Sequence, residues 1–213
     1  MVSAESTWQS LSDPWRAAFD EAWTSWSNGC FGIGAVAVRD GEIVARGRNR
    51  VLEPKSEPGV IADSFTAHAE MNVLAALSWG QTEVELYTTL EPCLMCASSI
   101  LMARVPVVHF AGEDPLFSGL TEVLESHPFA ADRSPARHGP LEGSIRRFAQ
   151  LLPLTFVAFW AGPEGMSIEA TRAVDPALAD LAVALAGNGS LTEVKEAGGS
   201  TVDALDHLWA EIA

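Results

Sequence analysis

The sequence has little positive charge. Only 13 of its 213 residues are Lys or Arg, against 28 Asp or Glu, and its formal net charge is −15. Proteins that bind nucleic acids neutralise phosphates with Lys and Arg, so an acidic chain disfavours a nucleic-acid partner. We therefore expect a small molecule, not a polyanion, as the partner.

Long apolar runs and cysteines are also scarce. No stretch of 18 consecutive apolar residues is present, which excludes an ordinary transmembrane helix. Residues 1–13 lack the basic start and apolar stretch of a secretion signal. Three cysteines are too few for a disulfide framework and fit a reducing compartment better. These absences predict a cytoplasmic protein that makes no membrane contact.

Two short motifs together offer a set of metal ligands. The first reads His-Ala-Glu at positions 68–70, and the second reads Pro-Cys-Leu-Met-Cys at 92–96. A catalytic zinc ion takes three nitrogen or sulfur ligands from the protein and keeps its fourth position open. His68, Cys93 and Cys96 supply three such ligands. This H-x-E and P-C-x-x-C pair is the signature of zinc-dependent base deaminases.

The spacing of the second motif suits metal binding. Cys93 and Cys96 are three residues apart, so on a helix they share one face, and Pro92 fits the first helical turn. A helix N-terminus also favours the thiolate form. One alternative is a closed structural zinc site, with Cys30 or a second histidine as fourth ligand. The glutamate Glu70 and the proline before the first cysteine favour the catalytic site.

These motifs resemble those of the cytidine/deoxycytidylate deaminase superfamily. Residues 87–97 are similar to its tRNA adenosine deaminase and guanine deaminase branches, and residues 68–72 to deoxycytidylate deaminase. The resemblance covers about residues 28–160. It implies one Zn²⁺ bound by the three ligands above. It also implies that Glu70 is the catalytic proton carrier, which takes a proton from water and delivers it to the substrate's ring nitrogen.

The same resemblance implies a set of substrate-binding residues, namely Asn49, Ala69, Asp114 and Phe117. Asn49 matches an asparagine that holds the base, Asp114 would read an amino or ring N–H group, and Phe117 would stack on a base. Ordinary structural roles remain open for two of them. Asn49 can simply end a strand, and an Asp before a Pro is a common turn.

The hydrophobic pattern predicts an α/β fold, a three-layer α/β/α sandwich with a central five-stranded sheet. A helix over 13–27 carries an aromatic stripe, which we interpret as core, and an Asp40–Gly41 turn predicts a hairpin. Alternating strands and helices imply parallel pairing, with the site beyond the carboxyl ends of the strands. The remaining expected elements are strands at 31–38, 43–49, 83–88, 107–111 and 154–160, and helices starting at His68 and spanning 93–103 and 144–152.

The chain divides into a deaminase domain at 1–161, which includes the N-terminal helix, and an acidic helical extension at 162–213. In the extension, 176–186 and 202–212 are expected to be helices. Residues 52–64 and 126–143 are expected to be loops. Around the second loop lies a basic cluster that is either a phosphate site or a solvated surface: Arg133, Arg137, His138, Arg146 and Arg147.

The expected function is a zinc-dependent hydrolytic deaminase of a small nucleobase, nucleoside or related aminated heterocycle, which releases ammonia. The alternatives are a tRNA adenosine deaminase and a deoxycytidylate-type nucleotide deaminase. A non-enzymatic alternative is an inactive, zinc-stabilised binding protein, which the intact Glu70 disfavours. Relatives are commonly dimers or larger, so a homodimer is expected. The sequence does not choose between purine and pyrimidine.

Overall fold

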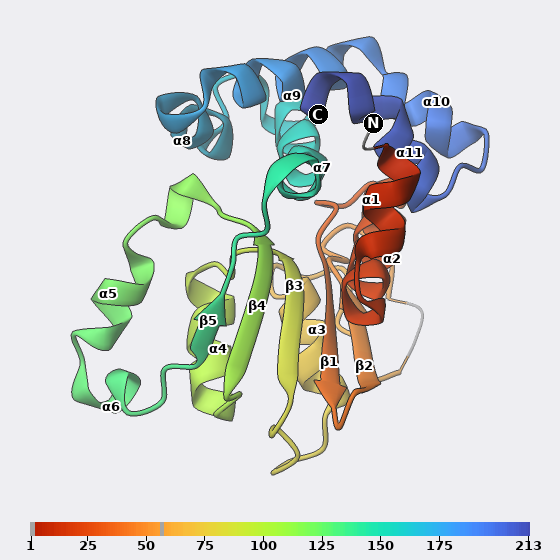
Figure 1. Ribbon diagram of the computed structural model, residues 1–213. Helices are drawn as coiled ribbons and strands as arrows, with labels where there is room; N and C mark the ends of the chain where they lie inside the picture. Colours follow the sequence, from red (N-terminus) through yellow and green to blue (C-terminus); the bar gives the residue numbers. More distant parts are fainter. Residues whose placement is uncertain (1–2, 56–57) are drawn as a thin grey trace.

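A five-stranded mixed sheet forms the centre of the computed structural model, which describes residues 3–55 and 58–213 (Figure 1). The strand order is β2-β1-β3-β4-β5. β1 pairs antiparallel with β2 and β3, whereas β3, β4 and β5 pair in parallel. Every strand except β1 therefore ends at the same edge. The strands are β1 Gly34–Arg39, β2 Glu42–Arg48, β3 Glu85–Leu90, β4 Val107–Gly112 and β5 Ala136–His138.

The β1–β2 hairpin turns at the predicted residues. Asp40 and Gly41 both have positive φ, 52° and 83°. Two successive positive φ values are typical of the two-residue turn whose twist matches that of the flanking strands. The hairpin brings Gly47 of β2 against α3 (Ala69–Ala76), where a Cβ on Gly47 would lie 2.5 Å from the Ala69 carbonyl oxygen. Only glycine allows this approach.

Helices cover both faces of the sheet, which confirms the three-layer prediction. α3 and α4 (Leu94–Ala103) pack on one face, where Val73 and Ile100 are buried against Leu86 and Val108 of the strands. α2 (Asp13–Ser27) and α7 (Gly143–Ala161) pack on the other. The aromatic stripe of α2 lies in the core as expected, with Phe19 fully buried and 5.9 Å from the Phe148 ring of α7.

The expected strand over 154–160 is wrong. These residues continue α7, which runs through Pro153 to Ala161. A short apolar run does not by itself distinguish a buried strand from a buried helix, and Pro153 does not end this helix. The fifth strand is instead Ala136–His138, inside the segment expected to be a loop.

The C-terminal helices stack above α7 (Figure 1). Leu178 and Leu205 share one hydrophobic cluster with Phe19 and Phe148, and the Trp23 indole donates to the Gly199 carbonyl at 2.8 Å. The division at residue 161 stays a prediction. The other helices are α1 Ala4–Ser10, η1 Pro115–Phe117, α5 Leu120–Glu125, α6 Pro128–Ala131, α8 Met166–Val174, α9 Pro176–Asn188, α10 Ser190–Glu196 and α11 Thr201–Ile212.

No helix within residues 3–55 and 58–213 is long and apolar enough to span a membrane. Most of the expected loop at 52–64 is irregular, as predicted, but its residues 56–57 lie outside the described part of the chain.

Candidate active site

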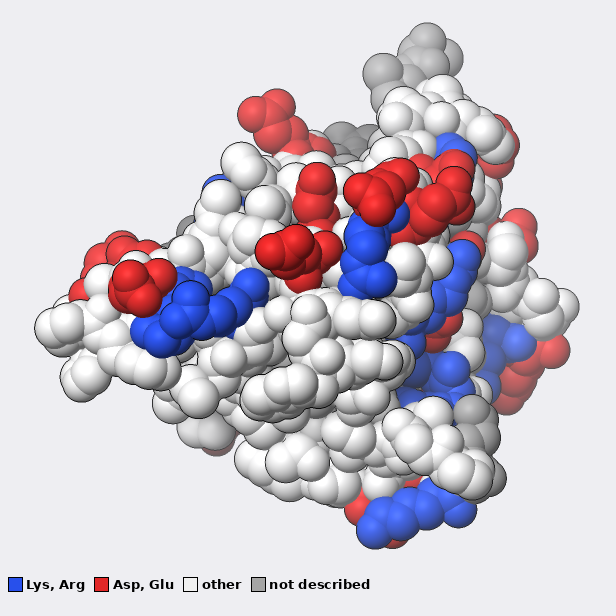
Figure 2. Space-filling model, turned by 90° about the horizontal axis from the view of Figure 1, so that it is seen from below, with Lys and Arg blue, Asp and Glu red and all other residues white. Residues whose placement is uncertain are grey.

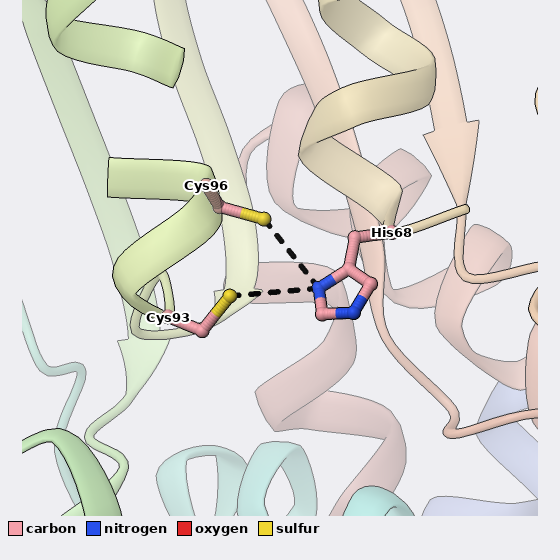
Figure 3. Close-up of side chains that lie close together, drawn as sticks. All are labelled: His68, Cys93 and Cys96. Atoms are coloured by element: carbon pink, nitrogen blue, oxygen red, sulfur yellow. Dashed lines mark hydrogen bonds between the residues drawn. The ribbon is translucent and has the colours of Figure 1, made fainter. Parts of the chain in front are cut away.

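Three potential metal ligands meet at one point beyond the end of β3. The Nδ1 atom of His68 lies 3.6 Å from Cys93 Sγ and 3.5 Å from Cys96 Sγ (Figure 3). A tetrahedral zinc ion, with Zn–N bonds of about 2.0–2.1 Å and Zn–S bonds of about 2.3 Å, separates such atoms by about 3.5 Å. Both nitrogen–sulfur separations therefore match those of a tetrahedral zinc site.

Two helix N-termini place these ligands. His68 is the N-cap of α3, and Cys93 is the N-cap of α4, three residues after β3 ends. The unpaired N–H groups at a helix start favour negative charge, which suits thiolates. A hydrogen bond with the Cys96 thiol lowers the pKa of Cys93 to about 4, and the same bond raises the pKa of Cys96. Both effects favour a thiolate at Cys93 over one at Cys96.

Cys30, a possible fourth ligand of a closed site, lies elsewhere. It is buried, and its Sγ accepts a hydrogen bond from the Leu52 N–H at 3.4 Å. Within the described residues, the group whose ligand atoms lie within 4.8 Å of one another contains His68, Cys93 and Cys96. The arrangement thus offers three protein ligands and an open position, as a catalytic zinc site requires.

Glu70 lies beside this cluster without belonging to it. The residue is 4% exposed, and its carboxyl group accepts a hydrogen bond from Cys96 Sγ at 3.3 Å and lies 3.4 Å from the Thr88 hydroxyl. Burial is the main cause that raises the pKa of Glu70 above its ordinary value. A carboxyl group with a raised pKa can both accept and return a proton near neutral pH.

A cavity of about 870 Å³ opens over the cluster and includes Glu70 in its wall. Three of its polar residues follow the ends of three strands, with Asn49 after β2, Glu91 after β3 and Asp114 after β4. This is the predicted position, because the carboxyl ends of these strands meet at one edge.

Asn49 is 1% exposed and lines the cavity. Its backbone is held on two sides. The Asn49 N–H donates to the Ile33 carbonyl at 2.9 Å, and the Ser25 hydroxyl of α2 donates to the Asn49 carbonyl at 2.8 Å. Its side-chain Oδ1 accepts from the Val51 N–H at 3.3 Å. The predicted base-holding residue is therefore fixed in the wall of the cavity.

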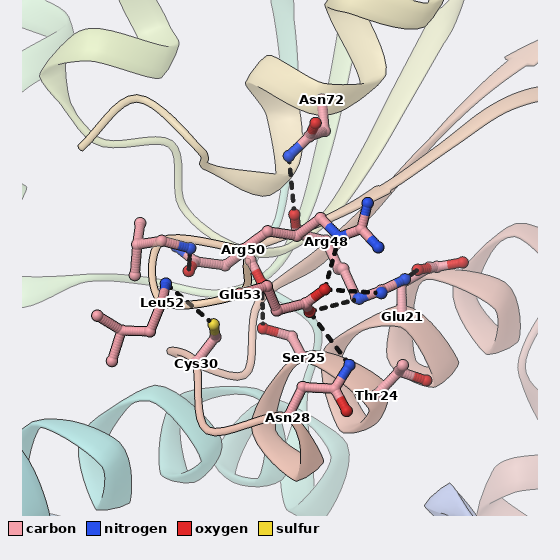
Figure 4. A network of polar contacts seen from close by, with 12 residues as sticks. Glu21, Thr24, Ser25, Asn28, Cys30, Arg48, Arg50, Leu52, Glu53 and Asn72 are labelled. Carbon is pink, nitrogen blue, oxygen red and sulfur yellow. Dashed lines mark hydrogen bonds and ion pairs between the residues drawn. The ribbon is translucent and has the colours of Figure 1, made fainter. Parts of the chain in front are cut away.

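A buried ion-pair network joins Glu53 to Arg48 and Arg50 (Figure 4). Glu53 accepts hydrogen bonds from both neighbours of Asn49, with Arg48 Nε at 2.9 Å and Arg50 Nε at 2.8 Å. Asn28 adds a third donor at 3.2 Å. Burial opposes ionisation of Glu53, but these donors outweigh it and lower its pKa. The network joins α2, the end of β2 and the following loop.

The other predicted substrate residues lie in different surroundings. Asp114 and Phe117 line the cavity. Burial raises the pKa of Asp114 to about 6, although its carboxylate accepts from the Leu116 N–H at 3.0 Å. Ala69 is fully buried in the core between α3 and the sheet, and it is not one of the cavity-lining residues. Its role in substrate binding stays a prediction.

The predicted basic cluster does not form one phosphate site, because its arginines pair with different carboxylates. Arg137 bonds Glu91 at 2.6 Å, and Arg146 bonds the Glu113 carboxylate. The other pairs are Arg147–Asp175 and Arg133–Asp132. On the face seen from below, basic and acidic side chains are likewise interspersed (Figure 2).

Sequence reasoning missed one wall of the cavity. Side chains of α7 and α8 complete it, among them Pro153, Val157, Trp160, Met166 and Thr171. Interpreting residues 154–160 as a strand hid this wall, because a helical period is needed to place Val157 and Trp160 on one face. Glu53 was also missed, and no local pattern in the sequence identifies its two arginine partners.

Known proteins resemble much of this chain. Residues 9–111 match the family model described as the cytidine and deoxycytidylate deaminase zinc-binding region, which confirms the predicted cofactor. The tRNA-specific adenosine deaminase of Streptococcus pyogenes serotype M18 is 32% identical over 125 residues, which are 55% of this chain and 77% of the relative. The tRNA-specific adenosine deaminase 2 of Danio rerio is 34% identical over 123 residues.

The coverage of these relatives varies. The Danio rerio match spans 52% of this chain and 54% of the relative, so the chain covers about half the length of that protein. Among solved structures, one from a study of A-to-I editing by tRNA:A34 deaminases is 32% identical, with a TM-score of 0.49, and it covers 60% of this chain and 91% of that one.

These relatives overturn the expectation that a nucleic-acid partner is disfavoured, because their names state an activity on tRNA. The expectation used net charge, which sums over the whole chain and neglects the apolar faces of bases, to which aromatic side chains bind.

The residues matched by the family model, 9–111, include His68, Cys93 and Cys96. With its zinc-binding region and relatives of this identity and coverage, the chain belongs to the cytidine and deoxycytidylate deaminase family.

Proposed function

We propose that this protein is a zinc-dependent hydrolytic deaminase that converts adenosine to inosine in a tRNA. The observation that supports the reaction is the position of Glu70, a buried carboxyl group 3.3 Å from one sulfur of a three-ligand site. The tRNA-specific relatives support the substrate. Deamination of a free base or nucleoside, the function first expected, becomes the second candidate.

The metal ligands and Glu70 would have different roles in the reaction. His68, Cys93 and Cys96 would hold zinc, which when bound supplies the Lewis acid that makes water nucleophilic at neutral pH. Glu70 would take a proton from the attacking water and pass it to the ring nitrogen next to the reacting carbon. It would then help the exocyclic amine leave as ammonia. The net reaction adds one water and releases one ammonia.

Polar residues in the wall of the cavity, Asn49 and Asp114, would orient the base. Asn49 is buried at the cavity wall with its backbone held by Ser25 and Ile33, so its amide is a fixed hydrogen-bonding group. A preorganised group of this kind lowers the cost of placing the substrate in its reactive geometry. Asp114 follows β4 at the same edge of the sheet and would read a donor on the substrate.

The second candidate is a free nucleobase or nucleoside. It is favoured by α7 and α8, which close one side of the cavity, and by the arginines beside it, which are paired with carboxylates. Both features suit a small neutral substrate. The same reaction would follow with the same residues.

One experiment separates the two candidates. The zinc-loaded protein is incubated with unmodified tRNA transcripts, and inosine is measured by nucleoside analysis after digestion. In parallel, ammonia release is followed with adenine, adenosine, guanine, cytosine and cytidine. The proposal expects inosine in at least one tRNA, lost in Glu70→Ala. Ammonia from a free compound with no inosine in any tRNA would favour the second candidate.

A further inference from the structure

Two aromatic side chains on the cavity wall are largely exposed. Phe65, three residues before the zinc histidine, is 89% exposed, and Trp160 of α7 is 66% exposed. They come from segments that are far apart in the sequence but border the same cavity. Large apolar side chains left open in a binding cavity indicate a partner that covers them.

The cavity is larger than one base requires. Its volume of about 870 Å³ is near the upper end of the roughly 300–1,000 Å³ range that holds drug-sized ligands. The reacting base must lie near Glu70 and Cys93. The cavity therefore has room for more than the reacting base.

The charges around the cavity do not favour phosphate as the group that fills this space. Glu91 and Glu113 line it, and the arginines next to them, Arg137 and Arg146, are paired with these carboxylates. Instead of unpaired positive charge, the cavity wall presents the neutral aromatic rings of Phe65 and Trp160. Base stacking on aromatic side chains binds single-stranded nucleic acid without sequence readout, because every base has a π-face.

We propose that Trp160 and Phe65 form stacking platforms for the nucleotides that flank the deaminated one. This inference rests on the proposed tRNA function and deepens it. The target base enters beside Glu70, and at least one neighbouring base leaves the loop stack to lie on Trp160 or Phe65. Binding then depends on ring contact more than on phosphate pairing, which is how an acidic protein can hold an RNA loop.

The test compares Trp160→Ala and Phe65→Ala with Phe159→Ala. Phe159 is the neighbour of Trp160 in α7 and is 77% exposed, but it is not one of the cavity-lining residues. Inosine formation is measured on a tRNA anticodon stem-loop. We expect KM to rise about 5- to 150-fold in Trp160→Ala or Phe65→Ala, the range that one lost stacked base implies. We expect kcat to change less than threefold.

Two further variants exclude a merely structural effect. Trp160→Phe and Phe65→Tyr keep a ring and should restore most of the KM, whereas Phe159→Ala should leave both constants unchanged. Thermal unfolding of each variant shows whether the fold is kept. The dependence of KM on salt should also be shallow, with a log–log slope smaller in magnitude than about 2, because each neutralised phosphate of a single strand contributes about 0.7.

The failure of this inference differs from the failure of the proposed function. If the unmodified protein forms no inosine in any tRNA, the function itself is wrong. If it forms inosine but both alanine variants keep the original KM, the function stands and the stacking platforms are wrong. A rise in KM that Trp160→Phe and Phe65→Tyr do not reverse would also overturn the inference.

Discussion

Glu53 and Arg48 form a bidentate ion pair, in which Glu53 Oε1 lies 2.9 Å from Arg48 Nε and Glu53 Oε2 lies 3.0 Å from Arg48 Nη2. Arg48 also lies 3.6 Å from Glu21 of α2. The pair is largely shielded from solvent, and it fixes the residue immediately before Asn49. The loop that begins at the cavity-lining Asn49 is therefore held by charge as well as by backbone hydrogen bonds.

Replacing Glu53 with alanine is expected to destabilise the protein by about 3–5 kcal/mol, because it removes the buried carboxylate that Arg48 and Arg50 share. The free energy of unfolding is measured in urea. Asp13→Ala is the matched control, since Asp13 pairs with Arg16 at the surface and exposed ion pairs contribute about 0–1 kcal/mol. Equal losses in the two variants would contradict the role of the buried pair.

Removal of a zinc ligand is expected to remove the metal. Cys93→Ala and Cys96→Ala should contain little zinc by elemental analysis and should unfold at lower temperature, because metal binding is coupled to folding. Cys30→Ala is the control and should keep its zinc. Full zinc occupancy in both ligand variants would show that the metal site lies elsewhere.

Replacing Glu70 with alanine should leave zinc content and fold intact and abolish most turnover. Proton transfer by a positioned side chain typically contributes about 10²- to 10⁴-fold to the rate, so kcat should fall at least by this range. Zinc content by elemental analysis and kcat by ammonia release are measured on one preparation. Near-normal turnover would rule out the proton-carrier role.

The raised pKa of Asp114 predicts that the free energy of unfolding depends on pH. Burial raises its pKa to about 6 in the folded protein, above the ordinary value of 3.8. Below about pH 4 both states are protonated and the group has no effect. Between pH 4 and 6 the unfolded state ionises first, so the free energy of unfolding falls as the pH rises.

Asp114→Asn removes this pH dependence. The variant should therefore gain stability relative to the unmodified protein as the pH rises from 4 to above 6, measured by urea unfolding across that range. A Glu125→Gln variant, at an exposed acidic position of α5, serves as the control. A constant difference between Asp114→Asn and the unmodified protein at all pH values would contradict the raised pKa.

The sequence predicted the elements whose signals are local. The helix at 13–27 begins after Ser12 with Pro14 in its first turn, and the hairpin turns at Asp40–Gly41; both lie where the pattern placed them. The metal ligands were equally accessible, because a motif fixes residue types at fixed spacing. The three donor atoms then meet with separations that fit zinc.

Elements determined by distant contacts were not predictable in this way. The β5 strand has three residues, too few for a period, and it forms because β4 pairs with it. Residues 154–160 belong to α7, and this helix packs against α9 and the sheet. Asn49 was identified from the resemblance, but its support by Ser25 comes from α2, 24 residues earlier.

Residues of α8 line the cavity that contains Glu70, so the C-terminal helices and the candidate active site are in contact. Met166 and Thr171 line the cavity, while the rest of the C-terminal layer packs on α2 and α7. Any ligand that contacts this wall binds only when α8 is docked, so binding must oppose the local opening of the C-terminal helices. Occupancy near Glu70 would then be visible as slowed amide hydrogen exchange in residues 166–174, which are distant from Glu70 along the chain.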